Sequence, residues 1–192
     1  KIAWKYLNMI SMQKKEARRK AKKIRAKENN NLSAFQIIEN IPESIFSDKI
    51  IAGYWPLPNE LDIIPLLKCC FAQGNKVSLP CTPEKGKPLL FRNWLPSDNL
   101  KEGLYGTREP FPEKAQVVPN LILLPLLAFT SEGCPLGYGG GYYDRTLASL
   151  RLNNDIFACG IAFAGQEVDF LPTDNFDQKL DGILTDKYFK AF

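Results

Sequence analysis

The chain has 192 residues, of which 45% are hydrophobic and 24% are charged; these values exclude a wholly disordered or fibrous protein and predict one substantial core. It contains no histidine, which excludes catalytic dyads and triads that need an imidazole, so any chemistry must use carboxylates, amines, phenols, backbone N–H groups or a bound ion. The net charge is +4, but residues 1–27 hold eleven Lys or Arg and one acid, and such a basic arm indicates an anionic partner: nucleic acid, a membrane surface or a phosphate-bearing small molecule.

Strong helix formers predict a basic helix from about residue 12 to residue 28, packed on the body of the protein. Ala17, Ala21 and Ile24 recur at helical spacing and form its predicted apolar side. Lys14 and Arg18 lie four residues apart on one face and flank that side, so ligand binding and a solvated basic face are about equally favoured for them. The other basic residues are expected to face solvent: Lys15, Arg19, Lys22 and Lys23.

A second helix is predicted from Ser33 to the residues before Pro42, followed by a buried strand over 49–55 and a loop stiffened by prolines. Glu60 lies on this loop, shortly after Trp55. A carboxylate beside an indole suits a flat heterocycle with N–H donors, through stacking and a forked hydrogen bond. The alternative is that Glu60 is an ordinary loop acid, and apart from the nearby indole this alternative is favoured.

The remaining elements alternate between strands and helices, with an irregular stretch over 95–120. This alternation predicts an α/β fold: a single domain over 1–192 with a mostly parallel sheet and helices on both faces. Ligands bind such sheets beyond the carboxyl ends of the strands, where the loops 55–62 and 130–145 lie. The predicted helices span 62–73, capped by Asp62, and 142–150, and the predicted strands span 77–80, 89–94, 121–124, 157–163 and 182–185.

The segment Gly137-Tyr138-Gly139-Gly140-Gly141-Tyr142-Tyr143-Asp144-Arg145 connects a predicted strand to a helix. Four glycines in five positions cost conformational entropy on folding, but they let backbone N–H groups converge on an anion at the N-terminus of the helix. The pattern is neither the phosphate-binding loop with Gly-Lys-Ser/Thr nor the spaced dinucleotide-binding pattern. We therefore expect an anion-binding loop, with a flexible strand-to-helix connection as the alternative.

The candidate catalytic residues follow this loop in the first turn of the helix: Tyr143, Asp144 and Arg145. Beside a phosphate-binding loop, Asp144 is a natural Mg²⁺ ligand because this cation prefers one or two carboxylates together with phosphate oxygens and water. The equally favoured alternative is an acid stabilised by the helix dipole. Asp177 or Asp181 could supply a partner carboxylate, although their spacing alone favours solvated side chains.

Five cysteines are an odd number without the spacing of metal ligands, and we expect reduced thiols in a cytoplasmic protein. The opening residues lack the apolar region of a signal peptide, and the longest nearly apolar run, 121–129, is too short to cross a membrane.

The strongest motifs of the chain resemble the signature of the 5-formyltetrahydrofolate cyclo-ligase family, also called 5,10-methenyltetrahydrofolate synthetases: the segments 125–129 and 136–145, with Gly133 between them. The resemblance extends along nearly the whole chain, to Lys14 and Arg18, the loop from Trp55 to Glu60, and the tail over 160–177. The glycine–tyrosine–aspartate string is specific to the family. The other motifs are weak alone and support the resemblance because they occur in the same order along the chain.

The resemblance implies a fold of the ribose-phosphate-isomerase/CoA-transferase-like kind and an ATP- and Mg²⁺-dependent closure of 5-formyltetrahydrofolate to 5,10-methenyltetrahydrofolate, with release of ADP and phosphate. In that chemistry the formyl oxygen attacks the γ-phosphate, N10 closes on the activated carbon and phosphate leaves, so no protein nucleophile is required. By matching position it implies that ATP is bound by Lys14, Arg18, Pro135, Leu136, Gly137, Tyr138, Gly139, Gly140, Gly141, Tyr142 and Tyr143. It further implies that folate contacts Trp55, Glu60 and 138–142, and that Asp144 and Asp177 hold Mg²⁺.

Three positions depart from the family pattern: Thr130 stands where members often have Asp, Pro135 where they often have Arg, and Phe176 where many have His. The missing loop arginine is expected to weaken ATP binding unless Arg145 compensates for it.

Two other functions stay open at this point. The basic helix over 14–27 has enough charge to bind nucleic acid, but this function leaves the glycine loop and Glu60 unexplained. A family member that binds folate without turnover is the second. For the enzyme we expect 5-formyltetrahydrofolate and ATP as small-molecule partners, a monomer, and neither membrane nor nucleic acid.

Overall fold

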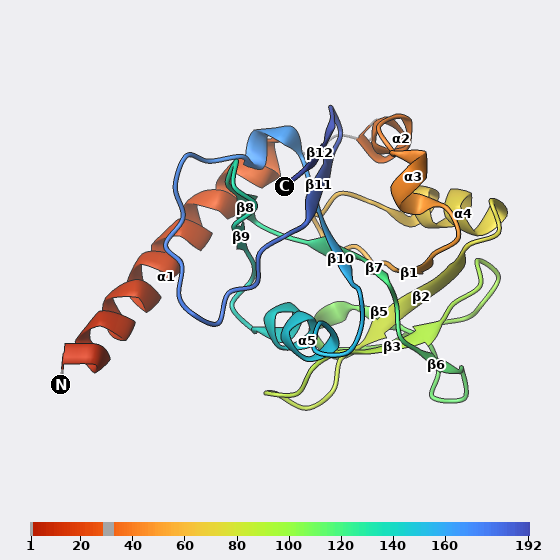
Figure 1. The fold of residues 1–192 in the computed structure, drawn as a ribbon, viewed down its shortest axis with the longest axis horizontal. Coiled ribbons are helices and arrows are strands. Elements are labelled where there is room, and N and C mark those ends of the chain that lie inside the picture. The colour runs from red at the N-terminus through yellow and green to blue at the C-terminus, as the bar shows by residue number, and fades with distance from the viewer. Residues whose placement is uncertain (1, 29–32) are drawn as a thin grey trace.

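The structure, a computed structural model, describes residues 2–28 and 33–192 and is built around an eight-stranded sheet in the order β12-β11-β10-β7-β1-β2-β3-β6 (Figure 1). The inner strands run parallel: Gly182–Thr185 (β11), Phe157–Ala162 (β10), Leu121–Pro125 (β7), Ile50–Ala52 (β1) and Lys76–Cys81 (β2). Antiparallel strands border them, Phe189–Ala191 (β12) at one edge and Leu90–Asn93 (β3) with Gln116–Val117 (β6) at the other. The predicted α/β fold with a mostly parallel sheet is confirmed.

Helices cover both faces of this sheet, as expected (Figure 1). The helices Ser33–Glu39 (α2), Glu43–Phe46 (α3) and Ile64–Ala72 (α4) pack on one face, and Tyr142–Leu150 (α5) packs on the other. Successive residues of a strand point to opposite faces, so each inner strand contributes to both cores. In β7, for example, Leu121 and Leu123 belong to the core beneath α4, whereas Ile122 and Leu124 belong to the core beneath α5.

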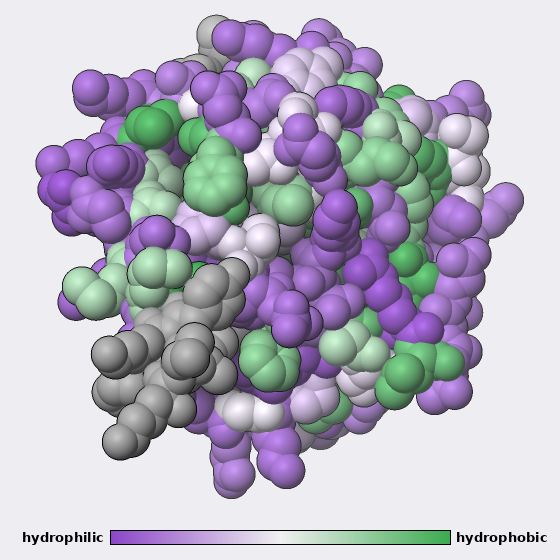
Figure 2. Space-filling model, turned by 60° about the vertical axis from the view of Figure 1, so that its left-hand side comes forward, coloured by the Kyte–Doolittle hydropathy of each residue, from purple (hydrophilic) through white to green (hydrophobic). Residues whose placement is uncertain are grey.

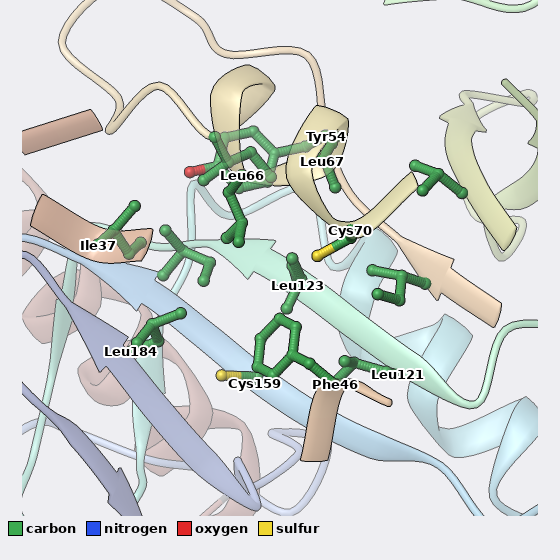
Figure 3. Close-up of a cluster of buried hydrophobic side chains, with 14 of the residues drawn as sticks. Ile37, Phe46, Tyr54, Leu66, Leu67, Cys70, Leu121, Leu123, Cys159 and Leu184 are labelled. Atoms are coloured by element: carbon green, nitrogen blue, oxygen red, sulfur yellow. The ribbon is translucent and has the colours of Figure 1, made fainter. Parts of the chain in front are cut away.

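The core on the α4 side is formed by almost fully buried side chains from α2, α4 and the inner strands (Figure 3). Tyr54, just beyond the end of β1, is part of this core. Its hydroxyl donates a hydrogen bond of 2.8 Å to the carbonyl oxygen of Leu61. Because Tyr54 and Leu61 bracket the loop that carries Glu60, this bond fixes both ends of the loop to the core.

Most predicted elements lie within one or two residues of their observed bounds, and α5 and β11 have the predicted bounds. Asp62 accepts a hydrogen bond of 2.9 Å from the backbone N–H of Ile64, the first residue of α4, but the N-cap position belongs to Ile63, so Asp62 lies one residue before the capping position predicted for it. The irregular stretch contains only short elements among its described residues: Lys101–Glu102 (β4), Leu104–Gly106 (η1), Arg108–Glu109 (β5) and β6. The strand predicted over 49–55 is shorter, and β12 and α3 were not predicted.

The N-terminal helix α1 (Ile2–Glu28) starts earlier than predicted and lies along one side of the molecule (Figure 1). Ala21 packs in a small cluster with Leu127, Leu136 and Leu171. The prediction that Ile24 belongs to this packed side is wrong, because Ile24 is 37% exposed whereas its neighbour Arg25 is 6% exposed. At about 100° per residue, Arg25 lies closer to the direction of Ala21 than Ile24 does, so the helix buries the arginine.

The outward side of α1 is exposed at Lys15, Arg19, Lys22 and Lys23, as predicted. Figure 2 shows hydrophilic residues over much of the face on this side of the molecule, with hydrophobic residues in separate groups. No helix in the described part of the chain is long and apolar enough to cross a membrane. The five cysteines carry free thiols, as expected.

Candidate functional site

Two loops meet beyond the carboxyl ends of the inner strands, and α1 contacts both. One is the loop over 53–60 that follows β1; the other is the glycine loop, 137–141, between Pro135–Leu136 (β9) and α5. Strand β9 pairs with Ala128–Phe129 (β8) in a two-stranded ribbon that follows β7. Hydrogen bonds connect the glycine loop to α1 and to the loop after β1. The two loops expected to form the site are therefore brought together.

Glu60 is buried in this site, with 6% of its surface exposed. Its Oε2 accepts a hydrogen bond of 2.7 Å from the backbone N–H of Leu57, and its Oε1 accepts one from the hydroxyl of Tyr138. Burial raises the pKa of Glu60 above its usual value, against the opposing effects of these two hydrogen bonds and of the charge of Arg25. These surroundings differ from those of a solvated loop acid.

The glycine loop needs glycine at two positions because Gly139 (φ 98°) and Gly141 (φ 66°) have left-handed backbone conformations. Gly141 precedes α5 without a side-chain cap, so the first N–H groups of the helix are left for another acceptor. Arg18 lies along this loop, and its Nε donates a hydrogen bond of 2.9 Å to the carbonyl oxygen of Gly137. A Cβ at Gly139 would lie 3.1 Å from the Arg18 guanidinium carbon. The loop thus presents backbone donors beside a cation, which suits an anionic ligand.

Lys14 is buried and forms two ion pairs with the tail of the chain. Its Nζ lies 2.8 Å from Oδ2 of Asp174 and 2.6 Å from Oδ1 of Asp177. Burial alone would lower the pKa of Lys14, but the hydrogen bonds and charges of the two carboxylates raise it, so the ammonium stays charged. Two residues that the resemblance assigns to ATP and to Mg²⁺, Lys14 and Asp177, therefore contact each other.

Asp144 lies in the first turn of α5 and faces the same carboxylates. Its Oδ1 accepts a hydrogen bond of 3.1 Å from the backbone N–H of Gln178. Burial raises the pKa of Asp144, the Gln178 N–H opposes this rise, and the charges of Asp177 and Asp174 add to it. Asp181, in contrast, pairs with Arg151 at 2.7 Å and also accepts a backbone N–H, so it has a structural role.

The carboxylates of this region fit a cation only together with a further ligand. Among the described residues, no group of three or more His, Cys, Asp or Glu side chains is placed to hold a metal ion. Mg²⁺ is usually held by one or two carboxylates together with phosphate oxygens and water. Asp144 and Asp177 therefore suit a cation shared with a phosphate, rather than a cage made by the protein alone.

Four aromatic or basic residues border the site. Arg145 donates a hydrogen bond of 2.8 Å to the carbonyl oxygen of Gly140, and its Cζ lies 5.1 Å from the centre of the Tyr142 ring. Tyr105, from the irregular stretch, contacts Tyr142 edge to face with ring centres 6.5 Å apart. Trp55 is half buried against the α4-side core, which leaves part of its indole exposed for stacking.

The sequence did not identify two charged residues of this site, Arg25 and Asp174. Arg25 follows Lys14 and Arg18 at eleven and seven residues, a spacing that places all three on one side of α1. Asp174 precedes Asp177 by three residues in the acidic tail. The helical spacing was a usable signal for Arg25, whereas no local pattern distinguished Asp174 from a solvated acid.

Comparison with known proteins adds an independent observation. The chain matches the model of the 5-formyltetrahydrofolate cyclo-ligase family over residues 10–186. It is 35% identical over 141 residues to a 5-formyltetrahydrofolate cyclo-ligase of Haemophilus influenzae, covering 71% of this chain and 75% of that protein. The corresponding protein of Escherichia coli K12 is 32% identical over 140 residues, covering 70% and 76% of the two chains.

A solved structure agrees with these sequence similarities. The NMR structure of 5,10-methenyltetrahydrofolate synthetase from Aquifex aeolicus is similar with a TM-score of 0.75 and 28% sequence identity. The similarity covers 93% of this chain and 92% of that one, so the two proteins share nearly the whole fold.

Proposed function

This chain belongs to the 5-formyltetrahydrofolate cyclo-ligase family, and from this premise we propose that it closes 5-formyltetrahydrofolate to 5,10-methenyltetrahydrofolate with ATP and Mg²⁺, through a phosphorylated formyl group. ADP and inorganic phosphate are the other products. The proposed enzyme is monomeric and cytoplasmic, in keeping with its free thiols.

One observation supports this proposal most directly: adjacent residues of the glycine loop contact the two halves of the site. Gly137 accepts a hydrogen bond from Arg18, which belongs to the proposed phosphate side. Tyr138 donates one to Glu60, which belongs to the proposed folate side. In this proposal a single short loop is adjacent to both substrates, as transfer of a phosphoryl group between them requires.

The proposed reaction proceeds in two steps. The formyl oxygen attacks the γ-phosphorus of ATP, the bond from this phosphorus to the β–γ bridging oxygen breaks, and ADP leaves. N10 then adds to the activated formyl carbon, the carbon–oxygen bond breaks, phosphate leaves and the N10 proton is lost to water. Neither step needs a protein nucleophile, in keeping with the absence of histidine, and the protein acts by positioning and charge neutralisation.

The proposed roles follow the geometry of the two sides. Lys14 and Arg18 neutralise the phosphates of ATP, which the backbone over 135–143 surrounds. Glu60 accepts hydrogen bonds from the pterin ring or the N5–formyl region, with Trp55 and 138–142 around it. The Tyr143 phenol stays protonated because burial and the nearby charge of Glu60 raise its pKa, so it can donate a hydrogen bond.

Asp144 and Asp177 are the residues proposed to hold Mg²⁺, and their carboxylates suit a cation shared with ATP. When bound, this cation neutralises charge on the phosphates. Arg145, from the same turn of α5 as Asp144, replaces the arginine that stands in many members at the position of Pro135. Its present hydrogen bond to Gly140 keeps its guanidinium beside the loop.

Nucleic-acid binding is the weaker candidate because the site uses the inner side of α1. Lys14 and Arg25 are buried among partners from the glycine loop, the loop after β1 and the acidic tail. Only the outer residues of α1 remain for a polyanion, and an RNA or DNA complex made by them would weaken steeply with added salt.

An isotope experiment tests the proposed intermediate. If 5-formyltetrahydrofolate carries a heavy oxygen isotope at the formyl group, the mechanism sends that oxygen to inorganic phosphate, which mass spectrometry detects. Heavy oxygen in water, with unlabelled phosphate, would exclude attack of the formyl oxygen on ATP.

A further inference from the structure

Arg25 is a buried cation in a helix whose other basic residues are mostly exposed. Its side chain is 7% exposed, whereas Lys22, Lys23 and Lys27 on the same helix are open to solvent. Removing a guanidinium from water is costly unless hydrogen bonds and an opposite charge compensate for it. Arg25 must therefore be compensated by its partners inside the site.

Those partners connect Arg25 to Glu60 by two routes. Its Nη1 lies 3.9 Å from Oε1 of Glu60, and the same Nη1 donates a hydrogen bond to the hydroxyl oxygen of Tyr138. The guanidinium carbon also lies 5.2 Å from the centre of the Tyr138 ring. The side chains come from α1, from the loop after β1 and from the glycine loop, so they join three separate segments of the chain.

The direction of these hydrogen bonds is fixed by chemistry. Arginine can only donate, so the oxygen of Tyr138 accepts from Arg25 and its O–H must point to Glu60. Glu60 receives this O–H at Oε1 and the Leu57 N–H at Oε2. An ionised carboxylate has about four acceptor positions, so both oxygens keep unused acceptor capacity for substrate N–H donors.

We infer that Arg25 is a positioning residue for Glu60: through its charge and through Tyr138 it keeps the carboxylate ionised and oriented to accept hydrogen bonds from the folate substrate. This inference rests on the proposed function in one respect, namely that Glu60 contacts folate. Arg25 itself does not contact the substrate and acts through Glu60.

The electrostatics of the site support this role. Burial favours the protonated, uncharged form of Glu60, which accepts hydrogen bonds poorly. The other titratable groups that face it are the phenols of Tyr54 beyond β1, Tyr138 on the glycine loop and Tyr143 on α5; burial raises the pKa of each, so they remain neutral. Arg25 supplies the positive charge among these groups.

Two substitutions separate the charge of Arg25 from its hydrogen bond. Arg25→Gln keeps a donor for Tyr138 but has no charge, and Arg25→Lys keeps the charge. Lys22→Met is the matched control, because Lys22 is an exposed basic residue of the same helix. Thermal melting establishes that each variant is folded before binding is measured.

The first measurement is equilibrium binding of 5-formyltetrahydrofolate, without ATP, over a range of pH. We expect Arg25→Gln to weaken binding about ten- to a hundredfold at neutral pH and to shift the acid limb of the binding curve to higher pH. In Arg25→Lys the acid limb should lie at the same pH as in the parent, and Lys22→Met should bind folate as the parent does. A loss that is equal at all pH values, or an equal loss of MgATP binding, would overturn the inference in favour of a purely structural role.

The second measurement does not depend on folate. Isotope-edited NMR of the Glu60 carboxyl group in the ligand-free protein should show its titration displaced to higher pH in Arg25→Gln and close to the parent in Arg25→Lys. An unchanged titration in Arg25→Gln would overturn the inference, whatever the folate result. The two measurements can also disagree. If the Glu60 titration is displaced in Arg25→Gln but the parent protein does not bind folate, the link between Arg25 and Glu60 is supported and the proposed function is refuted. If Arg25→Gln fails to fold, the Arg25→Lys titration decides, since a displaced curve despite the retained charge would overturn the inference.

Discussion

The ammonium of Lys14 lies 2.6 Å from the carboxylate of Asp177, although the two residues are 163 positions apart in the chain. Asp174 adds a second contact to the same ammonium at 2.8 Å. Because Lys14 is the proposed phosphate ligand and Asp177 the proposed metal ligand, ATP and Mg²⁺ must replace or share these contacts. The carboxylates therefore compete with ATP for Lys14.

Asp174→Asn is expected to strengthen ATP binding in the absence of Mg²⁺. The substitution removes one competitor for Lys14, while the asparagine oxygen can still accept the hydrogen bond that the Phe176 N–H gives to Oδ1. A partly exposed ion pair is worth up to about 1 kcal/mol, which corresponds to roughly a fivefold gain in affinity. Calorimetric titration with ATP checks this, with the exposed Asp169→Asn as control. Weaker ATP binding in Asp174→Asn would show that the carboxylate helps the site rather than competing with it.

Gly139→Val is expected to lower ATP affinity at least about tenfold in a folded protein. The left-handed φ of 98° strains any residue with a side chain, and the added Cβ would crowd the Arg18 guanidinium. Gly137→Ala is the matched comparison, since a Cβ there meets no atom within 4 Å, and it should lose far less affinity. Equal ATP affinities of Gly139→Val and the parent would show that the loop does not bind the nucleotide.

Asp144→Asn is expected to abolish most turnover, by about two decades or more, without loss of stability. The pKa of Asp144 is raised in the folded protein, so folding favours its protonated form; that stabilisation is present at low pH and is lost as the pH rises through the raised value. At neutral pH the ionised carboxylate thus costs stability, and the variant should melt at the parent's temperature or above it. Melting curves and assays across Mg²⁺ concentrations measure the two effects. If the variant has the turnover and the metal dependence of the parent, Asp144 does not bind Mg²⁺ and only stabilises the N-terminus of α5 through the helix dipole.

Glu60→Gln is expected to weaken 5-formyltetrahydrofolate binding by about 1.5–3 kcal/mol, or one to two decades, and to leave MgATP binding nearly unchanged. The amide keeps the shape of the side chain but loses the charge and half of its acceptor capacity. Two titrations on the same folded variant, one for each ligand, decide the matter. Similar losses of affinity for both ligands would indicate a disturbed fold. Unchanged folate affinity would show that Glu60 does not recognise folate.

The arrangement of the loops was predictable because it follows from rules of parallel sheets. Apolar segments and the glycine string marked β7 and α5, and the carboxyl-end rule then placed Glu60 near the glycine loop. The edge strand β12 was not predictable in the same way, since its three residues are too few to show a period. The early start of α1 was also missed, because weak helix formers such as Trp4, Tyr6 and Asn8 alternate with strong ones before Met12.

The missed site residues have a common physical cause. In a strongly basic helix, most Lys and Arg side chains are expected to be solvated, and the burial of Arg25 depends on partners that the local sequence does not show. Asp174 meets Lys14 across 160 positions, a contact that only the folded chain creates.

The absorbance of the methenyl product reports directly on the proposed ATP-dependent closure of the folate ring. We expect this absorbance to rise when the purified protein is mixed with 5-formyltetrahydrofolate, ATP and Mg²⁺ together. Omission of any one of them should prevent the rise, and ADP should form in step with the product. Binding of both substrates without any rise, or a rise that does not require ATP, would contradict the proposed closure.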